Sequence, residues 1–268
     1  MSRTDEFVDI HCHLVPEIDD GSKSWDETFT MAKMAVDDGI TTIVVTPHQL
    51  GNYAHNTGDI IRQRTGVLQQ QLDRNGIPLR VLPGADVRIE DEMIEGLRRG
   101  DVLSLGDHRK HVLLELPHEL YFPLDRVLED LDRIGMTGIL SHPERNQGLL
   151  KRAEIVETLV EMGCLMQVTA GSLIGGMGPG PQRMSEWMLE LGLVHFLATD
   201  AHGPKSRSPL MWRAFERVAE LTDQETAVAI CCRNPRQVAE GRSVTAGRRQ
   251  SKTKRSVLSN WFTWRKAG

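Results

Sequence analysis

Short apolar runs alternate along the chain with longer segments in which apolar residues recur at helical spacing. Seven of these runs are rich in β-branched and aliphatic residues and have the length of buried strands. They span residues 7–10, 42–46, 79–82, 112–116, 138–140, 164–168 and 194–198. Strands that alternate with helices predict a parallel sheet with helices packed outside it. Seven such units within residues 1–240 predict an α/β fold, a distorted (β/α)7 TIM-like barrel that forms one domain.

The segment between the first two predicted strands carries the clearest helix signal. Ser24 and Glu27 have the spacing of a capping box. Trp25, Phe29 and Ala32 fall on one face of a helix. The sequence therefore predicts an amphipathic helix over residues 24–38.

Composition and charge narrow the class of protein. The 268 residues are 40% hydrophobic, which is ordinary for a globular protein with a sizeable core. No apolar run approaches the ~20 residues that span a bilayer, and residues 1–6 do not resemble a secretory signal, so we expect a cytoplasmic protein. All 37 acidic residues lie within residues 1–240, and their excess over basic residues argues against a nucleic-acid partner.

Residues 241–268 differ in composition from the rest of the chain. They contain eight Lys and Arg, no acidic residue, and the aromatic residues Trp261, Phe262 and Trp264. This composition predicts a flexible basic tail that contacts the anionic inner face of a membrane through its charges and rings. The alternative is a solvated end that aids solubility or docks on the barrel.

The cysteines do not indicate a redox or thiol-based site. Cys12, Cys164, Cys231 and Cys232 form no Cys-x-x-Cys pair. None of them begins the Cys-x5-Arg loop of cysteine-dependent phosphatases. A disulfide framework, a zinc knuckle and a thiolate nucleophile are therefore all disfavoured.

Residues suited to metal binding follow the first predicted strand, in the sequence Asp9-Ile10-His11-Cys12-His13. Period-two alternation would place Asp9, His11 and His13 on one side of that strand. Two neighbouring imidazoles can share an ion, and the Asp9 carboxylate is then the expected partner of a ring N–H. A pair of partly exposed structural histidines is the alternative.

Most of the later predicted strands also end in groups that bind metal ions or phosphate. The sequences at these ends are Thr46-Pro47-His48, Gly84-Ala85-Asp86, Leu114-Glu115-Leu116, Ser141-His142-Pro143-Glu144-Arg145 and Thr199-Asp200-Ala201-His202. Glu115 interrupts an apolar strand, where a carboxylate is costly to bury unless an ion compensates its charge. Because the carboxyl ends of barrel strands form one face of the barrel, we expect these side chains to gather in one metal site.

Asp20 is a further candidate ligand. It lies in Asp19-Asp20-Gly21, a sequence that is also typical of a simple tight turn, and we favour the ligand role. The remaining histidines lie within loops or at strand starts, where a surface or core role is expected. They are His55, His108, His111, His118 and His195, and they receive no assignment.

Taken together, these motifs resemble the polymerase and histidinol phosphatase (PHP) superfamily. The residues that carry the resemblance are Asp9-Ile-His-Cys-His13, Asp19-Asp-Gly21, Thr46-Pro-His48, Glu115, His142-Pro-Glu-Arg145 and Asp200-Ala-His202. The stretch from His11 to Gly21 looks closer still to the bacterial PHP-type protein-tyrosine phosphatases of the CpsB/YwqE kind, which accompany tyrosine kinases of capsule and exopolysaccharide synthesis. The resemblance covers roughly residues 6–240.

The resemblance implies a site of three divalent ions, described in this family with manganese. It assigns His11, His13, Asp86 and Asp200 to one ion, Asp86, Glu115 and His142 to a second, and Asp20, His48 and His202 to the third. Arg145 and Arg207 would match the phosphate-binding arginines of the family. The departure is Asp86, where the family prefers Glu, although the shorter side chain still bridges two ions if its strand lies closer to them.

The implied activity is hydrolysis of phosphotyrosine monoesters by a metal-activated water, with a bacterial tyrosine kinase as the phosphoprotein substrate. Arg145 and Arg207 would stabilise the phosphoryl oxygens, and surface ion pairs are their alternative role. Three other functions remain as alternatives. They are a small-molecule PHP phosphatase that acts on histidinol phosphate or a similar ester, a PHP nuclease, and a non-catalytic binding module that has lost its metal.

Overall fold

The structure is a computed structural model that describes residues 6–248. Its strands are β1 (Phe7–Cys12), β2 (Ile40–Val45), β3 (His48–Gln49), β4 (Arg80–Pro83), β5 (Asp86–Arg88), β6 (His111–Glu115), β7 (Thr137–Ser141), β8 (Leu165–Thr169) and β9 (Phe196–Ala198). All seven predicted strands are present. β3 and β5 are additional, and each continues the preceding strand beyond a two-residue interruption, Thr46-Pro47 and Gly84-Ala85.

The strands form two hydrogen-bonded sheets that together make the wall of a barrel. β1, β2 and β4 form the first sheet, and β3, β5, β6, β7, β8 and β9 form the second in that order, with parallel pairing throughout. At the remaining seam, the Asp200 N–H donates to His11 O at 2.7 Å and the His13 N–H donates to Ala201 O at 2.9 Å. The predicted parallel α/β barrel, with its seven predicted strands, is confirmed.

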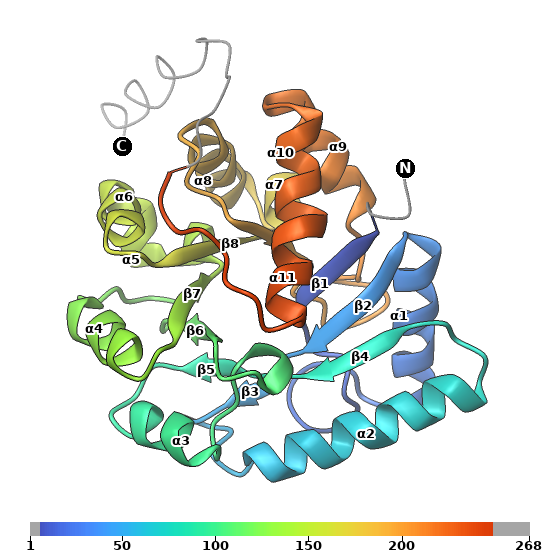
Figure 1. Ribbon diagram of the computed structural model, residues 1–268. Coiled ribbons are helices and arrows are strands. Elements are labelled where there is room, and N and C mark those ends of the chain that lie inside the picture. Colours follow the sequence, from blue (N-terminus) through green and yellow to red (C-terminus); the bar gives the residue numbers. More distant parts are fainter. Residues whose placement is uncertain (1–5, 249–268) are drawn as a thin grey trace.

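Helices surround the strands, as Figure 1 shows. They are α1 (Trp25–Asp37), α2 (Gly58–Arg74), α3 (Met93–Arg99), α4 (Asp125–Arg133), α5 (Gln147–Lys151), α6 (Glu154–Glu161), α7 (Ala170–Leu173), α8 (Pro179–Glu190), α9 (Trp212–Leu221), α10 (Gln224–Val228) and α11 (Asn234–Ala239). A π-helical stretch, Ala229–Arg233, joins α10 to α11. The helix predicted over 24–38 is confirmed as α1, and the Ser24 hydroxyl caps it by accepting from the Glu27 N–H at 3.3 Å.

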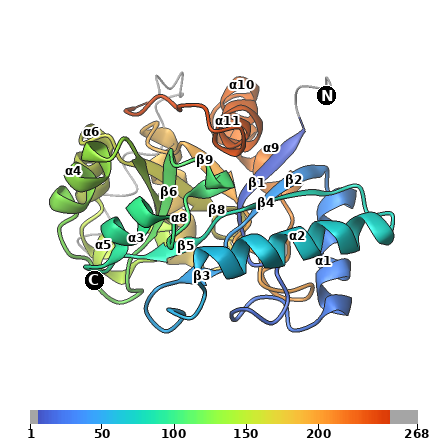
Figure 2. The same cartoon turned by 60° about the horizontal axis from the view of Figure 1, so that its bottom comes forward.

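Two apolar cores stabilise this arrangement. The larger fills the space between the strands and the outer helices. The smaller lies inside the barrel and includes Val8, Phe196 and Leu165, which stand at or near the starts of their strands. Val238 and Ala239 of α11 belong to the inner core, so α11 closes the end of the barrel at which the strands begin. Figure 2 shows α10 and α11 on one side of the strands and the loops that follow β1 and β3 on the other.

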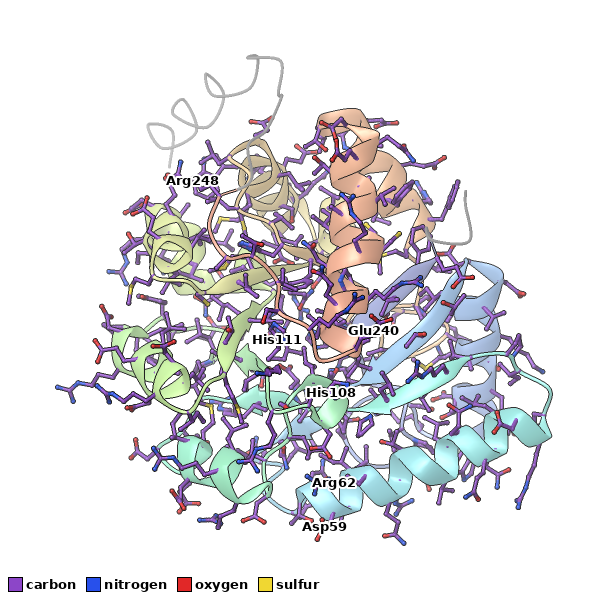
Figure 3. The ribbon with its side chains drawn as sticks, in the orientation of Figure 1. Asp59, Arg62, His108, His111, Glu240 and Arg248 are labelled. Carbon is purple, nitrogen blue, oxygen red and sulfur yellow. The ribbon has the colours of Figure 1, made fainter. Side chains whose placement is uncertain are left out.

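Residues 241–248 run across the end of the barrel that α11 closes. Val244 packs against the inner core, and His195 Nε2 lies 3.1 Å from Gly247 O. Arg248, labelled in Figure 3, forms ion pairs with Glu157 and Glu161 of α6. The first part of the predicted tail therefore lies on the barrel, whereas its aromatic residues and its predicted membrane contact fall outside the described residues. Within residues 6–248, no helix is both long enough and apolar enough to cross a membrane.

Candidate metal centre

The nine predicted ligand residues gather at the carboxyl ends of the strands, away from α11. Their nitrogen and oxygen ligand atoms form four groups, in each of which these atoms lie within 4.8 Å of one another. The groups are His13, Asp20, His48 and His202; His11, His142 and Asp200; His11, His13 and Asp86; and His48, Asp86 and Glu115. Because the groups share members, they form one continuous cluster.

An irregularity in β1 aims His11 into the cluster. Three steps along β1, from Asp9 to Cys12, face only two steps along β2, which is the signature of a β-bulge. The alternation of side chains shifts there, since Ile10 belongs to the inner core and Cys12 to the outer one. His11 therefore points inward, on the opposite side of the strand from Asp9.

His11 lies at the centre of the buried part of the cluster. Its Nε2 is 3.2 Å from Asp200 Oδ1, 3.3 Å from His13 Nε2 and 3.5 Å from Asp86 Oδ2. Each of these side chains is 1% exposed or less. A metal ion bound by these atoms would replace direct contacts between them.

His48 connects the buried part of the cluster to its outer part. The Nδ1 atom of His48 is 3.5 Å from Asp86 Oδ2 and 3.5 Å from Glu115 Oε2. Its Nε2 is 3.4 Å from Asp20 Oδ1, and the same oxygen is 3.4 Å from His202 Nε2. The Asp20 side chain is 51% exposed, so the cluster extends from the barrel interior to solvent.

All four groups differ in membership from the ligand sets that the family resemblance implies, and the position of His142 shows the largest difference. The resemblance places His142 on the same ion as Asp86 and Glu115. The structure groups His142 with His11 and Asp200 instead. The nine side chains are thus neighbours as expected, while the groups of adjacent ligand atoms are not the sets that the resemblance assigns to single ions.

The buried polar atoms of the cluster fit a set of divalent ions. Both oxygens of Asp86, Asp200 Oδ1, His48 Nδ1 and His202 Nε2 have no hydrogen-bond partner among the described residues. Leaving a buried polar atom unpaired costs about 1–3 kcal/mol, and more for a charged group. Imidazole nitrogens and carboxylate oxygens are ligands of divalent metals, so ions at these positions would satisfy the atoms that the chain leaves unpaired.

Burial and neighbouring charge shift the pKa values of the cluster in opposite directions. Burial would lower the pKa of His11, but the carboxylates of Asp200 and Asp86 raise it to about 9. Burial lowers the pKa of His13 to about 4. Burial and the nearby Asp86 raise the pKa of Glu115 to about 7. Because metals bind the deprotonated forms, protons and metal ions compete for these atoms.

Two side chains that received no role from the sequence hold the rings of the histidines. Gln167 Oε1 lies 2.8 Å from His11 Nδ1. Asp19 Oδ2 lies 2.7 Å from His13 Nδ1 and accepts the His48 N–H at 3.0 Å. Such partners set the orientation of a ligating imidazole. Two features of the sequence could have indicated these partners. Gln167 is a polar residue inside the apolar run 164–168, and Asp19 is the first acid of the Asp-Asp-Gly turn.

The expectation that Asp9 holds a histidine ring is wrong, because the bulge in β1 turns Asp9 away from the cluster. Its carboxylate accepts the His11 backbone N–H at 3.2 Å, the Thr199 N–H at 3.1 Å and the Thr199 hydroxyl at 2.5 Å. Asp9 therefore joins β1 to the end of β9 and helps to close the barrel beside the site.

Gly21 allows the Asp-Asp-Gly turn to lie against β1. A Cβ atom at this position would come within 2.4 Å of His13 O and 2.5 Å of His13 Cβ. Any other residue would push the turn outward, together with the carboxylates of Asp19 and Asp20. The glycine is thus required by its close approach to His13, directly after β1.

The two predicted phosphate-binding arginines converge on one oxygen beside the cluster. Arg145 Nη1 and Arg207 Nη2 both donate to Asp200 Oδ2, Arg207 at 2.5 Å. Both arginines line a pocket of about 220 Å³ that also reaches ligand residues. His142, Asp200 and Arg207 have positive φ angles of 33°, 51° and 51°. Such conformations cost on the order of 1–3 kcal/mol each and concentrate at functional sites.

The cysteines do not contribute a nucleophile to this pocket. Cys12, Cys164, Cys231 and Cys232 are all buried and free. Burial raises the pKa of the Cys12 thiol well above its ordinary value, which disfavours the reactive thiolate. The chemistry of the site therefore rests on imidazole, carboxylate and guanidinium groups.

Comparison with known proteins relates the chain to bacterial phosphatases. Residues 7–240 match the family described as "Capsular polysaccharide synthesis, CpsB/CapC". Tyrosine-protein phosphatase YwqE of Bacillus subtilis is 36% identical over 204 residues, which are 75% of this chain and 80% of that protein. A putative tyrosine-protein phosphatase CapC of Staphylococcus aureus is 31% identical over 210 residues, 78% of this chain and 82% of that protein. Tyrosine-protein phosphatase CpsB of Streptococcus pneumoniae is 25% identical over 237 residues, 87% of this chain and 98% of that protein.

A solved structure shares the same fold. It is a crystal structure from a study of YwqE from Bacillus subtilis and CpsB from Streptococcus pneumoniae, which are described as "unique metal-dependent tyrosine phosphatases". The TM-score is 0.85 at 31% sequence identity, with 92% of this chain and 100% of the other chain covered. The structural similarity therefore extends over nearly the whole barrel.

Asp86→Asn should lower the metal content of the purified protein by at least one ion per chain. The substitution keeps the volume of the side chain but removes the charge of a carboxylate that belongs to two ligand groups. Asp86→Glu, which keeps that charge, should retain the metal. Elemental analysis measures the metal-to-protein ratio directly.

Glu144→Gln provides the matched control for Asp86→Asn. The Glu144 carboxylate is also fully buried and accepts the Thr169 N–H at 3.1 Å, but it belongs to none of the four groups. Glu144→Gln should therefore keep the metal content of the wild type. An unchanged metal content in Asp86→Asn would contradict the assignment of Asp86 as a shared ligand.

Proposed function

The chain belongs to the CpsB/CapC family of capsular polysaccharide synthesis, and from this membership we propose that it is a metal-dependent protein-tyrosine phosphatase. Its relatives are named tyrosine-protein phosphatases, and the similar solved structure is described as metal-dependent. The observation in this chain that carries the proposal is one pocket that joins two arginines to a cluster of nine ligand-type side chains. This is the combination that a phosphoric monoester requires.

The proposed cofactor is a set of three divalent ions, with manganese as the expected metal. The residues that would hold them are His11, His13, Asp20, His48, Asp86, Glu115, His142, Asp200 and His202. Carboxylate oxygens suit manganese, whereas imidazole nitrogens also suit zinc and iron, so the metals are best compared directly. When bound, such ions neutralise phosphoryl charge and lower the pKa of a coordinated water toward ~7, which makes it a nucleophile at neutral pH.

Arg145 and Arg207 are the proposed phosphoryl-binding groups. Both guanidinium groups now bond to Asp200 Oδ2, and a phosphoryl group in the pocket would offer them oxygens in place of that carboxylate. Their side chains are 19% and 26% exposed, so a substrate can reach them while part of their surrounding water is excluded. Charge-assisted bonds of arginine to phosphate are short and directional, which suits the stabilisation of a developing phosphoryl charge.

The proposed substrate is a phosphotyrosine on a protein, and the proposed protein is a bacterial tyrosine kinase of polysaccharide synthesis. The capsular context of the family supports this partner. The Asp20 side chain is 51% exposed, which supports the proposal because a side chain of another protein can approach this part of the candidate ligand cluster. We propose a cytoplasmic location, in which the enzyme meets the cytoplasmic tyrosines of such a kinase.

The basic residues 241–268 are proposed to bring the enzyme to the membrane. Residues 241–248 lie across the end of the barrel that α11 closes, and Arg248 is held by Glu157 and Glu161. The basic and aromatic residues that follow Arg248 suit an anionic lipid surface, at about 1 kcal/mol per basic side chain near that surface. Contact through this end would leave the metal cluster, at the other end, facing away from the lipid.

Removal of metal should abolish the activity, and manganese should restore it. The measurement is hydrolysis of p-nitrophenyl phosphate and of phosphotyrosine peptides before and after exhaustive treatment with EDTA, followed by addition of manganese, zinc or iron. Phosphoserine peptides and histidinol phosphate serve as comparison substrates and should be hydrolysed poorly. Full activity after chelation, or preference for the small-molecule ester, would contradict the proposed function.

Arg145→Ala should lower kcat by ~10²-fold or more, as the loss of a transition-state hydrogen-bond donor typically does. Its metal content should stay at the wild-type value, because Arg145 belongs to none of the ligand groups. Arg133→Ala is the control, since Arg133 is 64% exposed on α4 and pairs with Glu129 and Asp130 of that helix. Arg145→Ala with wild-type turnover would remove Arg145 from the proposed mechanism.

The membrane contact can be tested by comparing the full chain with a chain that ends at Arg248. This truncation keeps the contacts of Val244, Gly247 and Arg248 with the barrel. The full chain should co-sediment with anionic liposomes, and its binding should weaken with added salt because charges near a lipid surface are screened. Equal sedimentation of both chains would exclude a membrane role for the tail.

A further inference from the structure

Release of tyrosine requires a proton that the groups assigned so far do not supply. The departing phenolic oxygen has a pKa of ~10, so it must be protonated at neutral pH. A side chain that donates this proton in the transition state typically contributes ~10²–10⁴-fold to the rate. Such a group must line the pocket and must not be engaged by the metal ions.

Most titratable side chains that line the pocket are already committed. Asp20, His48, Glu115, His142 and Asp200 all belong to the ligand groups. The guanidinium groups of the two arginines do not release protons in proteins. Among the described residues that line the pocket, His118 is the remaining titratable side chain.

His118 is accessible to a substrate from the rim of the pocket. It lies in the loop between β6 and α4, three residues beyond Glu115. Its side chain is 57% exposed. Its Nε2 is 4.0 Å from Glu119 Oε1, which is beyond hydrogen-bond distance. The ring therefore lines the pocket, and its long, solvent-exposed ion pair with Glu119 holds it only weakly.

The backbone on both sides of His118 is fixed to the start of α5. Asn146 Nδ2 donates to Pro117 O at 2.8 Å and to Leu120 O at 3.0 Å. The Gln147 N–H donates to His118 O itself at 2.9 Å. Asn146 is only 4% exposed, so its bonds to the loop are protected from water. The rim loop is thus held in place next to the phosphoryl-binding site.

Close packing reinforces this attachment. A Cβ atom at Gly148 would lie 2.6 Å from Tyr121 N and 2.7 Å from Tyr121 Cβ. The Arg152 guanidinium lies 5.6 Å from the centre of the Tyr121 ring, within the range of a cation–π contact. Because Arg145 directly precedes the residues that make these contacts, one segment positions both Arg145 and the loop that carries His118.

We propose that His118 is the general acid of the reaction, an inference that rests on the phosphatase function proposed above. The oxygen of a water molecule bonds to phosphorus, and the bond between phosphorus and the phenolic oxygen breaks. The proton of the His118 imidazolium passes to that oxygen and gives neutral tyrosine. The proton lost by the attacking water restores the imidazolium through solvent, so the products are tyrosine and inorganic phosphate.

The test compares two leaving groups in His118→Gln, since glutamine keeps a polar side chain but cannot donate a proton as an acid. kcat for a phosphotyrosine peptide should fall by ~10²-fold. kcat for p-nitrophenyl phosphate should fall far less, because p-nitrophenolate is a weaker base than tyrosine phenolate and departs with less protonation. His55→Gln is the control, since His55 is an exposed histidine of another rim loop that does not line the pocket.

Two results would overturn the assignment of His118. Equal losses on both substrates would show that the residue acts on the phosphoryl group or on the fold of the loop, and unchanged kcat on both would show no catalytic role. Metal content, measured in the same samples, should match the wild type. Failure of the phosphatase function would look different, because the metal-loaded wild type would then hydrolyse neither substrate.

Discussion

The burial of several carboxylates in one place is the constraint on which the rest of this structure depends. Asp86 and Asp200 are at most 1% exposed and both face His11. Buried charges of the same sign cost several kcal/mol unless opposite charges compensate them. In the chain alone, the compensation comes from Arg145 and Arg207 on Asp200 and from a His11 ring whose pKa is raised to about 9. In the proposed enzyme, bound metal ions would supply much of this compensation instead, and a phosphoryl group would accept bonds from the two arginines.

Contacts elsewhere in the barrel stabilise this unfavourable arrangement of buried carboxylates. The inner core packs Val8, Leu165 and Phe196 beneath the cluster, and the Asp9 carboxylate joins β1 to Thr199 at the seam of the barrel. These contacts together fix the positions of the strand ends. They therefore allow Asp200 and His142 to keep positive φ angles that an unsupported loop would relax.

The sequence predicts this fold well where local pattern decides the structure. Buried parallel strands are continuous apolar runs, so all seven predicted strands are recognisable in the sequence. The α1 helix is recognisable from its capping box and its apolar face. β3 and β5 are two and three residues long, too short to form a pattern. The bulge in β1 depends on its register with β2, and for that reason alternation misplaced Asp9.

In the candidate site, too, some residues are recognisable from local sequence, whereas others depend on tertiary contacts. The nine ligand-type side chains stand out because acids and histidines at strand ends are unusual in an apolar context. The partners of their rings were missed, since Gln167 comes from a strand 156 residues away from His11 in sequence. The group that contains His142 likewise depends on distances across the barrel, which no spacing along the chain records.

The segment from His142 to Gly148 links the metal, phosphate and leaving-group functions that are proposed for the pocket. His142 belongs to a ligand group, Arg145 lines the pocket, and Asn146 with Gln147 fixes the loop of His118. These residues belong to a 3-10 turn, Pro143–Arg145, to the start of α5, and to the single residues that precede each of them, His142 and Asn146. An insertion there would displace all three functions at once. Residues 241–248 cross the other end of the barrel, where Gly247 and Arg248 bond to His195, Glu157 and Glu161, so changes there would act far from the pocket.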